Sequence, residues 1–153
     1  MEKPRFETGE ARLLAGLSGH YGPATLTQIP ALWMRWGPAW FGKTPGQVGK
    51  KTYGACYNAD GKGNFDYLAG VEVASFDGLP DELTQLSLPA QRYAVFAHQS
   101  HISQIGMLWM HIYDQWLPAS GHKHADAADF ELYDEKFDPM IGIGHVEIWI
   151  PLQ

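Results

Sequence analysis

The chain has 153 residues, of which 45% are hydrophobic and 18% charged, and its formal net charge is −6. This composition is typical of one globular domain, and the negative charge argues against direct nucleic-acid binding, which requires clustered Lys and Arg. A single cysteine excludes an intrachain disulfide and a cysteine-built zinc site. Because the sequence has neither a signal-peptide core nor an apolar run of membrane-spanning length, we expect a cytoplasmic protein that does not enter a membrane.

Short sequences recur about 76 residues apart. Leu-Trp-Met occurs at 32–34 and at 108–110, and Val71-Glu72-Val73 is matched by Val146-Glu147-Ile148. Repetition at a nearly constant offset indicates two copies of one unit. We therefore predict a single domain over 1–153, with a first repeat over about 12–74, a linking segment over about 77–89 and a second repeat over about 92–152.

The first copy begins with a predicted strand over about Arg12–Leu17. A helix follows, with Pro30 near its start, where a missing N–H costs little, and with its end near Gly37-Pro38. Two strands near Lys51–Tyr57 and Asn64–Ala74 complete the copy. They are joined by "NADGKGN", whose Asp-Gly step is typical of a hairpin.

The second copy repeats this order. A strand over about Arg92–His98 precedes a helix that starts near Ser103, and Pro118 is expected to end that helix because it disfavours helical backbone at the residue before it. Strands near Asp129–Tyr133 and His145–Leu152 follow. The helix has an amphipathic stripe of Ile105, Leu108, Trp109, Ile112 and Trp116. The predicted fold class is α+β, with duplicated β-α-β-β units, an antiparallel sheet and helices packed on it.

Two apparent motifs lack the context that their chemistry needs. Residues 37–44 fit the phosphate-loop pattern, but a helix pattern precedes them and Pro45-Gly46 follows, whereas that loop needs a strand before it and a helix after it. His122 and His124 could point to one side of an extended segment, yet no zinc-site spacing accompanies them, and hydrogen bonds to the backbone are the expected role of the histidines. We predict no metal and no cofactor.

Glu147 stands beside Trp149 in the alternating C-terminal sequence "GHVEIWIPLQ". A carboxylate in apolar surroundings is costly unless it is paired, so a lipophilic cation would be a suitable partner, and each cation–π contact would add about 0.5–2 kcal/mol. From the strand alone, the alternative is that Glu147 pairs with an Arg or Lys across the sheet or faces water. Trp33 and Trp109 fit core packing and pocket lining equally well.

The sequences "FELYDEKFDP" and "VEIWIPL" resemble the GyrI-like effector-binding domain of multidrug-sensing bacterial regulators, and "IPALWMRWG", "YGACYNADGKGNFDYLAGVEV", "LPAQRYAVFAH" and "WLPASG" extend the resemblance over most of the chain. It implies two β-α-β-β units about a pseudo-twofold axis, with a small-molecule pocket near the axis. It also places the family's buried acid, which meets cationic aromatic ligands, at Glu147, and the internal repeat makes Glu72 its counterpart. The expected ligand-binding residues are Glu147, Trp149, Trp33, Trp109, Tyr57, Phe96 and Glu72. Tyr133 and Phe137 are expected to hold the long connection against the core.

Three functions are compatible with the sequence. The first is a stand-alone protein that binds hydrophobic, cationic aromatic molecules for sequestration or sensing, without the DNA-binding module of the regulators, since only about ten residues precede the first predicted strand. The second is a hydrolase for strained electrophilic natural products, with Glu147 as general acid or base. The third is a protein-interaction module of the gyrase-inhibitor type, whose partner the sequence does not identify.

Overall fold

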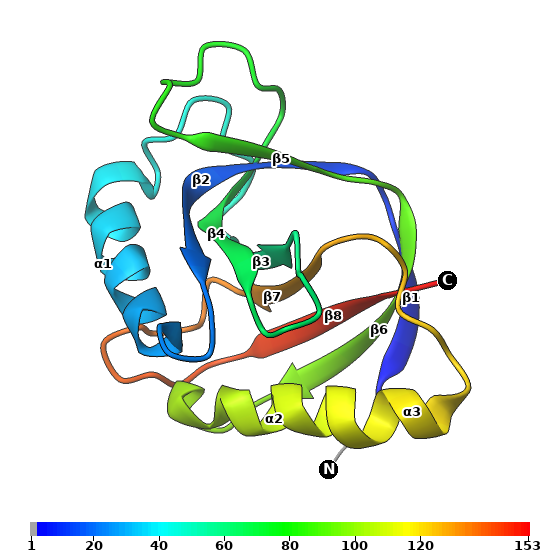
Figure 1. Cartoon of the computed structure of the whole chain (residues 1–153). Helices are drawn as coiled ribbons and strands as arrows, with labels where there is room; N and C mark the ends of the chain where they lie inside the picture. The colour runs from blue at the N-terminus through cyan, green and yellow to red at the C-terminus, as the bar shows by residue number, and fades with distance from the viewer. Residues whose placement is uncertain (1–2) are drawn as a thin grey trace.

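The structure is a computed structural model that describes residues 3–153, and these form an eight-stranded antiparallel sheet with two helical segments (Figure 1). The strand order is β1-β6-β8-β7-β3-β4-β2-β5. The strands are β1 (Arg5–Gly9), β2 (Arg12–Tyr21), β3 (Thr52–Tyr57), β4 (Phe65–Val73), β5 (Thr84–Leu88), β6 (Gln91–His98), β7 (Asp129–Tyr133) and β8 (Val146–Leu152). The helices are α1 (Ile29–Trp40), α2 (Ile105–His111) and α3 (Leu117–Ser120), with a π-helical turn (Ile112–Trp116) joining the last two. Within the described range, no helix combines the length and the hydropathy needed to cross a membrane.

The two predicted units are present and meet at the middle of the sheet. The first is β2-α1-β3-β4 and the second is β6-α2-β7-β8, with β3 and β7 as antiparallel neighbours. Gly54 of β3 lies opposite Glu131 of β7, so the pseudo-twofold axis passes close to this pair. The predicted α+β fold, with an antiparallel sheet and helices packed on it, is confirmed.

Two short strands outside the predicted units curl the sheet. β1 pairs with β6 and β5 pairs with β2, although β1 leads directly into β2 and β5 directly into β6. The connections are only Glu10-Ala11 and Pro89-Ala90, and so few residues span about 10 Å. The two ends of the sheet must therefore approach each other, which gives the curled shape in Figure 1.

β1 and β5 were not predicted from the sequence. Each has five residues, and β5 lies inside the segment expected to link the repeats. β1 reads "RFETG", with charged and mostly exposed side chains, so its sequence has no apolar face that would mark a strand. Both become strands because β6 and β2 offer open edges for pairing.

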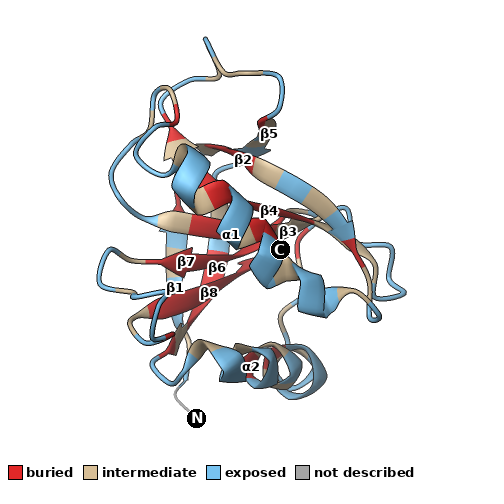
Figure 2. Ribbon diagram, turned by 90° about the vertical axis from the view of Figure 1, so that its left-hand side faces the viewer, coloured by how far each residue is buried: buried red, intermediate tan, exposed pale blue. Residues whose placement is uncertain are grey.

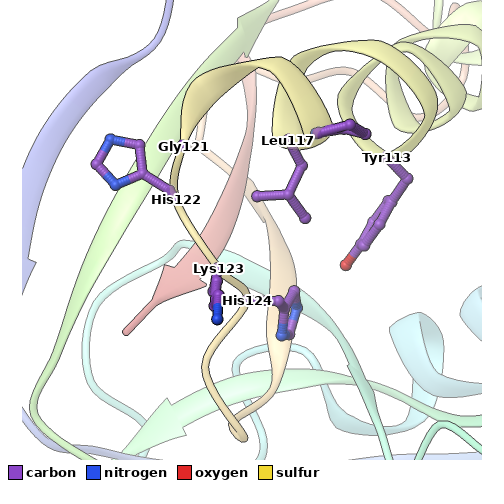
Figure 3. A pocket seen from close by; sticks show the side chains of 7 residues that line it. Tyr113, Leu117, Gly121, His122, Lys123 and His124 are labelled. Carbon is purple, nitrogen blue, oxygen red and sulfur yellow. The ribbon is translucent and has the colours of Figure 1, made fainter.

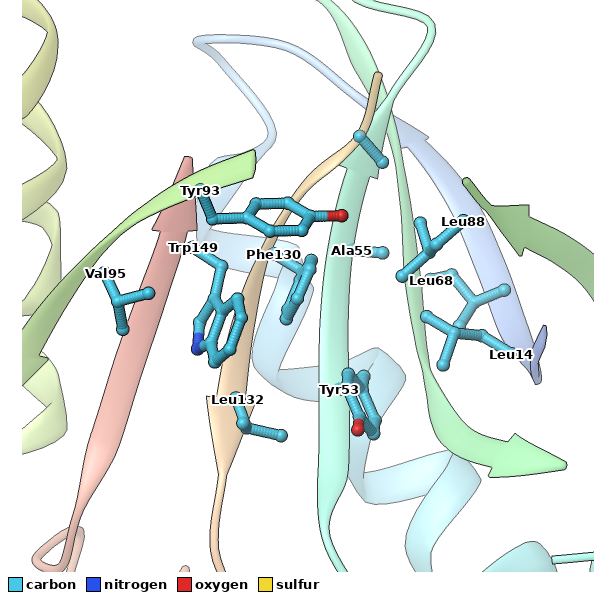
Figure 4. Packing of buried hydrophobic residues seen from close by; sticks show 11 residues of the cluster. Leu14, Tyr53, Ala55, Leu68, Leu88, Tyr93, Val95, Phe130, Leu132 and Trp149 are labelled. Atoms are coloured by element: carbon cyan, nitrogen blue, oxygen red, sulfur yellow. The ribbon is translucent and has the colours of Figure 1, made fainter. Parts of the chain in front are cut away.

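The curled sheet has an inner concave face and an outer face that carries the helices. The concave face is filled by a cluster of apolar and aromatic side chains (Figure 4). These are Leu14, Tyr53, Ala55, Leu68, Leu88, Tyr93, Val95, Ala128, Phe130, Leu132 and Trp149. On the outer face α1 covers the first unit and α2 covers the second, each over its own apolar cluster. Figure 2 shows that β7 and β8 are buried throughout.

Both helical segments run further than predicted. α1 continues through Pro38 to Trp40, and the next backbone N–H, that of Phe41, donates to the carbonyl of Gly37 at 3.0 Å. Pro118 does not end the second segment, because the π-helical turn places this proline in the first turn of α3, where no amide hydrogen is needed. That segment ends instead at Gly121, whose φ of 79° suits a glycine after a helix.

Candidate functional site

The centre of the outer face holds a buried glutamate, Glu131. Alternation along β7 directs Phe130 and Leu132 into the concave core and places Asp129, Glu131 and Tyr133 on the helix side. All five residues are buried, because the sheet is covered on both faces here. Glu131 is 7% exposed, and its position opposite β3 puts it at the junction of the two units.

Neutral donors surround the Glu131 carboxylate. The hydroxyls of Tyr67 and Tyr133 donate to Oε1 at 2.9 and 2.8 Å, and Nε1 of Trp109 donates to Oε2 at 2.9 Å. Among residues 3–153, no basic nitrogen lies within 4.0 Å of this carboxylate. Glu131 is thus hydrogen-bonded but has no counter-cation among the described residues, which is a costly state for a buried charge.

The two helices each contribute one tryptophan from equivalent positions of the repeat. Trp33 comes from α1 and Trp109 from α2, and both are half-buried. Nε1 of Trp33 donates to the Tyr67 hydroxyl at 3.0 Å, and the Trp33 ring meets the Tyr133 ring edge-on with centroids 5.4 Å apart. The acid therefore sits beneath two indoles and between two phenols, an arrangement suited to a lipophilic cation.

Burial controls the ionisation of Glu131. It raises the pKa of Glu131 above its usual value, and the nearby Asp129 carboxyl acts in the same direction. The three hydrogen bonds favour the charged form but do not cancel these effects. A positive charge brought close to Glu131 would therefore stabilise its carboxylate and lower this pKa.

Gly54 provides the space for this network. A Cβ atom on Gly54 would lie 2.0 Å from the Tyr67 hydroxyl oxygen and 2.8 Å from Oε1 of Glu131. Both distances are far below van der Waals contact, so no side chain fits here without moving the acid or its donor. The glycine is required by close approach, and its φ is not positive.

A second buried acid, Asp129, lies two residues before Glu131. It accepts a hydrogen bond from the Tyr113 hydroxyl, and its Oδ2 is 3.3 Å from Nε2 of His124. Nδ1 of the same ring faces the carbonyl of Ala125 at 2.5 Å, so both ring nitrogens face acceptors. The hydrogen bond to Asp129 is the main reason that the pKa of His124 is raised.

An aromatic row connects this second acid to the first. The ring of Tyr113 stacks on Trp109 on one side, with centroids 6.1 Å apart, and on His124 on the other, at 6.0 Å. An open cavity of about 480 Å³ lies beside the row, lined by Tyr113, Leu117 and the segment 121–124 (Figure 3).

Glu147 lies on the other side of the sheet. It points to the concave side with Trp149, which donates from Nε1 to Oε1 at 3.1 Å. Its Oε2 is 2.8 Å from Nη2 of Arg5 and 3.0 Å from Nε2 of His145. Burial acts to raise the pKa of this carboxyl, but its three hydrogen-bond partners outweigh burial, and the pKa lies below its usual value. The alternative interpretation, an ion pair across the sheet, describes this geometry.

The structure does not bring the seven predicted ligand-binding residues together. Trp33 and Trp109 lie at Glu131, on the outer face. Glu147, Trp149, Glu72 and Tyr57 belong to the concave side, where Glu72 accepts from the Tyr53 hydroxyl at 3.5 Å and Tyr57 packs on the apolar cluster. Phe96 packs under α2 against Trp116, with ring centroids 5.0 Å apart.

Glu131 and Tyr67 were not predicted as site residues, and Tyr133 was expected only to hold the following connection against the core. Tyr133 contacts Phe137, with ring centroids 5.0 Å apart, and it also donates to Glu131. One available signal was the acid in "DFELY", a short strand that is otherwise apolar or aromatic at its centre. An acid in such a strand is expected to be buried.

Known proteins resemble this chain over its whole length. The sequence model of the GyrI-like small molecule binding domain family matches residues 2–153 of this chain. The transcriptional regulator BrlR of Pseudomonas aeruginosa is 31% identical over 156 residues, covering 99% of this chain and 54% of BrlR, so the chain spans about half the length of that relative.

Solved structures share the fold. SAV2435 bound to tetraphenylphosphonium has a TM-score of 0.77 and 19% identity, over 99% of this chain and 94% of that one. An integron cassette protein from the mobile metagenome of Vibrio cholerae has a TM-score of 0.71 and 21% identity, over 99% and 97%. The chain belongs to the GyrI-like small molecule binding domain family.

Proposed function

We propose that this chain binds hydrophobic aromatic cations, for sequestration or sensing, and that Glu131 is the acid that meets the positive charge. One observation carries the proposal: Glu131 is buried at the junction of the two units, all its hydrogen-bond donors within residues 3–153 are neutral, and two tryptophans flank it. The structural neighbour SAV2435, solved with tetraphenylphosphonium, supports the cationic aromatic class.

The proposal assigns the central role to Glu131 rather than Glu147. Glu147 already has Arg5 and His145 within 3.0 Å, so a cation would compete with two resident partners. Glu131 has no such competitor among the described residues. A cation at Glu131 would gain the Coulomb attraction of a desolvated carboxylate, and each ring that it faces would add about 0.5–2 kcal/mol.

Access to Glu131 depends on the tryptophans. Nε1 of Trp109 donates a hydrogen bond to Oε2 of the acid. Trp33 donates to the Tyr67 hydroxyl, and its ring packs against the ring of Tyr133. A ligand that approaches from the helix side has to move at least one of these half-buried indoles aside and then stack against it. Apolar contacts of this kind have little directional preference, so ligands of different shapes can be accommodated.

The test compares a cation with a neutral molecule of similar shape. Tetraphenylphosphonium and triphenylphosphine oxide are titrated into the protein by calorimetry between pH 5 and pH 8. We expect tetraphenylphosphonium to bind more tightly as the pH rises through the raised pKa of Glu131, because the carboxyl is neutral below that pKa. The oxide is expected to show no such dependence.

Equal affinity for the two compounds at every pH would contradict the proposal. The hydrolase alternative needs a separate test, in which the protein is incubated with cyclopropane-bearing electrophiles and the products are analysed by mass spectrometry. A binding protein returns these compounds unchanged.

A further inference from the structure

A second cavity, of about 500 Å³, opens on the concave side of the sheet, away from Glu131. Its apolar lining consists of Tyr53, Leu132 and Trp149, which come from β3, β7 and β8. Figure 4 shows these three side chains among the concave cluster. The proposed cation site uses the opposite face of the same strands, so the two sites do not share a side chain.

Arg12 places a charged guanidinium group against three aromatic rings at this cavity. Its guanidinium carbon lies 5.0 Å from the ring centroid of Trp149, 5.6 Å from that of Phe130 and 5.9 Å from that of Tyr53. Its Nη1 atom is buried and has no hydrogen-bond partner among residues 3–153. In the same part of the chain, no carboxylate oxygen lies within 4.0 Å of Arg12.

Four other ionisable groups that line the cavity, those of Arg5, Glu7, Glu147 and His145, are paired with one another. Nε of Arg5 is 3.0 Å from Oε1 of Glu7, and Nη2 of the same residue is 2.8 Å from Oε2 of Glu147. His145 is 3.0 Å from the same Glu147 oxygen. Arg12 thus keeps one buried donor, on Nη1, from which no group among residues 3–153 accepts a hydrogen bond, and an unsatisfied buried donor is costly.

The mouth of the cavity limits the charge of an occupant. Lys51 and Lys136 are exposed there, but so is Glu135, and Asp134 is half-buried beside it. This mixture offers no concentration of positive charge for a dianion such as phosphate. It admits a single negative charge that reaches Arg12.

We propose that the concave cavity binds a small, flat aromatic monocarboxylate. The two oxygens of a carboxylate match the planar fork of the Arg12 guanidinium, and an aromatic ring finds apolar surface on Trp149 and Tyr53. This inference goes beyond the proposed cation binding, since it concerns a ligand of opposite charge on the opposite face.

The test uses benzoate, with benzamide as its neutral counterpart. Calorimetric titration of the full chain is expected to give saturable binding of benzoate and at least tenfold weaker binding of benzamide. Arg12→Gln is expected to weaken benzoate binding at least tenfold, whereas Arg35→Gln, at an exposed arginine of α1, leaves it unchanged. In ¹⁵N-resolved NMR spectra, benzoate is expected to shift the indole N–H signal of Trp149, identified through Trp149→Phe.

Three results would overturn the inference: no saturable benzoate binding, equal binding of benzamide, or undiminished binding to Arg12→Gln. If circular dichroism shows that Arg12→Gln does not fold, Arg12→Lys takes its place, because it keeps the charge and removes the planar fork; undiminished benzoate binding to it would equally overturn the inference. Glu131→Gln separates the two sites, since it is expected to retain benzoate binding while losing tetraphenylphosphonium binding.

Discussion

Replacing Glu131 with Gln is expected to weaken tetraphenylphosphonium binding at least tenfold, while Glu147→Gln changes it by no more than about twofold. The two substitutions make the same chemical change on opposite faces of the sheet. Gln keeps the size of the side chain but removes the charge that a cation would meet, and a tenfold loss corresponds to about 1.4 kcal/mol. Removing a charge from a desolvated pair commonly costs about 2–5 kcal/mol, so the expected loss is a lower bound.

Calorimetry of both variants over the same pH range is the measurement. Glu131→Gln is expected to remove the pH dependence of cation affinity, because the titrating carboxyl whose pKa is raised is gone. Binding of triphenylphosphine oxide serves as the control for pocket shape and is expected to be nearly unchanged in both variants. A loss confined to Glu147→Gln would place the cation on the concave side and contradict the assignment to Glu131.

Gly54→Ala is expected to lower the free energy of unfolding by about 2–4 kcal/mol and to weaken cation binding as well. The added methyl group would lie 2.0 Å from the Tyr67 hydroxyl and 2.8 Å from Oε1 of Glu131. Overpacking in a buried region costs about 1–3 kcal/mol, and a displaced hydroxyl would leave polar groups unsatisfied at a similar cost. Urea denaturation followed by tryptophan fluorescence gives the change in stability.

Gly106→Ala is the matched control for that substitution. Gly106 lies in α2, and nothing lies within 4 Å of a Cβ built there. Alanine in a helix is more favourable than glycine by about 0.5–1 kcal/mol, so this variant is expected to be as stable as the native chain or slightly more stable. If Gly54→Ala were as stable as the wild type and bound the cation equally well, the prediction would be wrong, because the Glu131 network would then tolerate a side chain at this position.

The repeat in the sequence predicted most of the fold. Because Leu-Trp-Met recurs at 32–34 and 108–110, both helices and their flanking strands could be placed in equivalent positions. β1 and β5 could not be predicted, because each is short and takes its strand conformation from an edge formed by distant residues. The full extent of the second helical segment depended on a π-helical turn, for which the apolar stripe gives no signal.

Two of the seven residues named from the sequence lie beside Glu131, the acid of the proposed site, and burial explains why the sequence did not point to Glu131 itself. Trp109 donates to Glu131 directly, and Trp33 donates to Tyr67, which in turn donates to Glu131. The alternation of side chains along β7 and β8 could not show whether Glu131 or Glu147 is the acid without a charged partner. Both strands are buried on both faces, so neither has a polar face that would mark the solvent side. One of the two partners of Glu147 is Arg5, which lies on β1, a strand that was not predicted from the sequence.

A crystal structure of the protein with tetraphenylphosphonium is the most direct measurement of the central claim. We expect the phosphorus atom within about 6 Å of the Glu131 carboxylate, with a phenyl ring against Trp33 or Trp109. A ligand bound on the concave side beside Glu147, with Trp109 still donating to Glu131, would contradict the account.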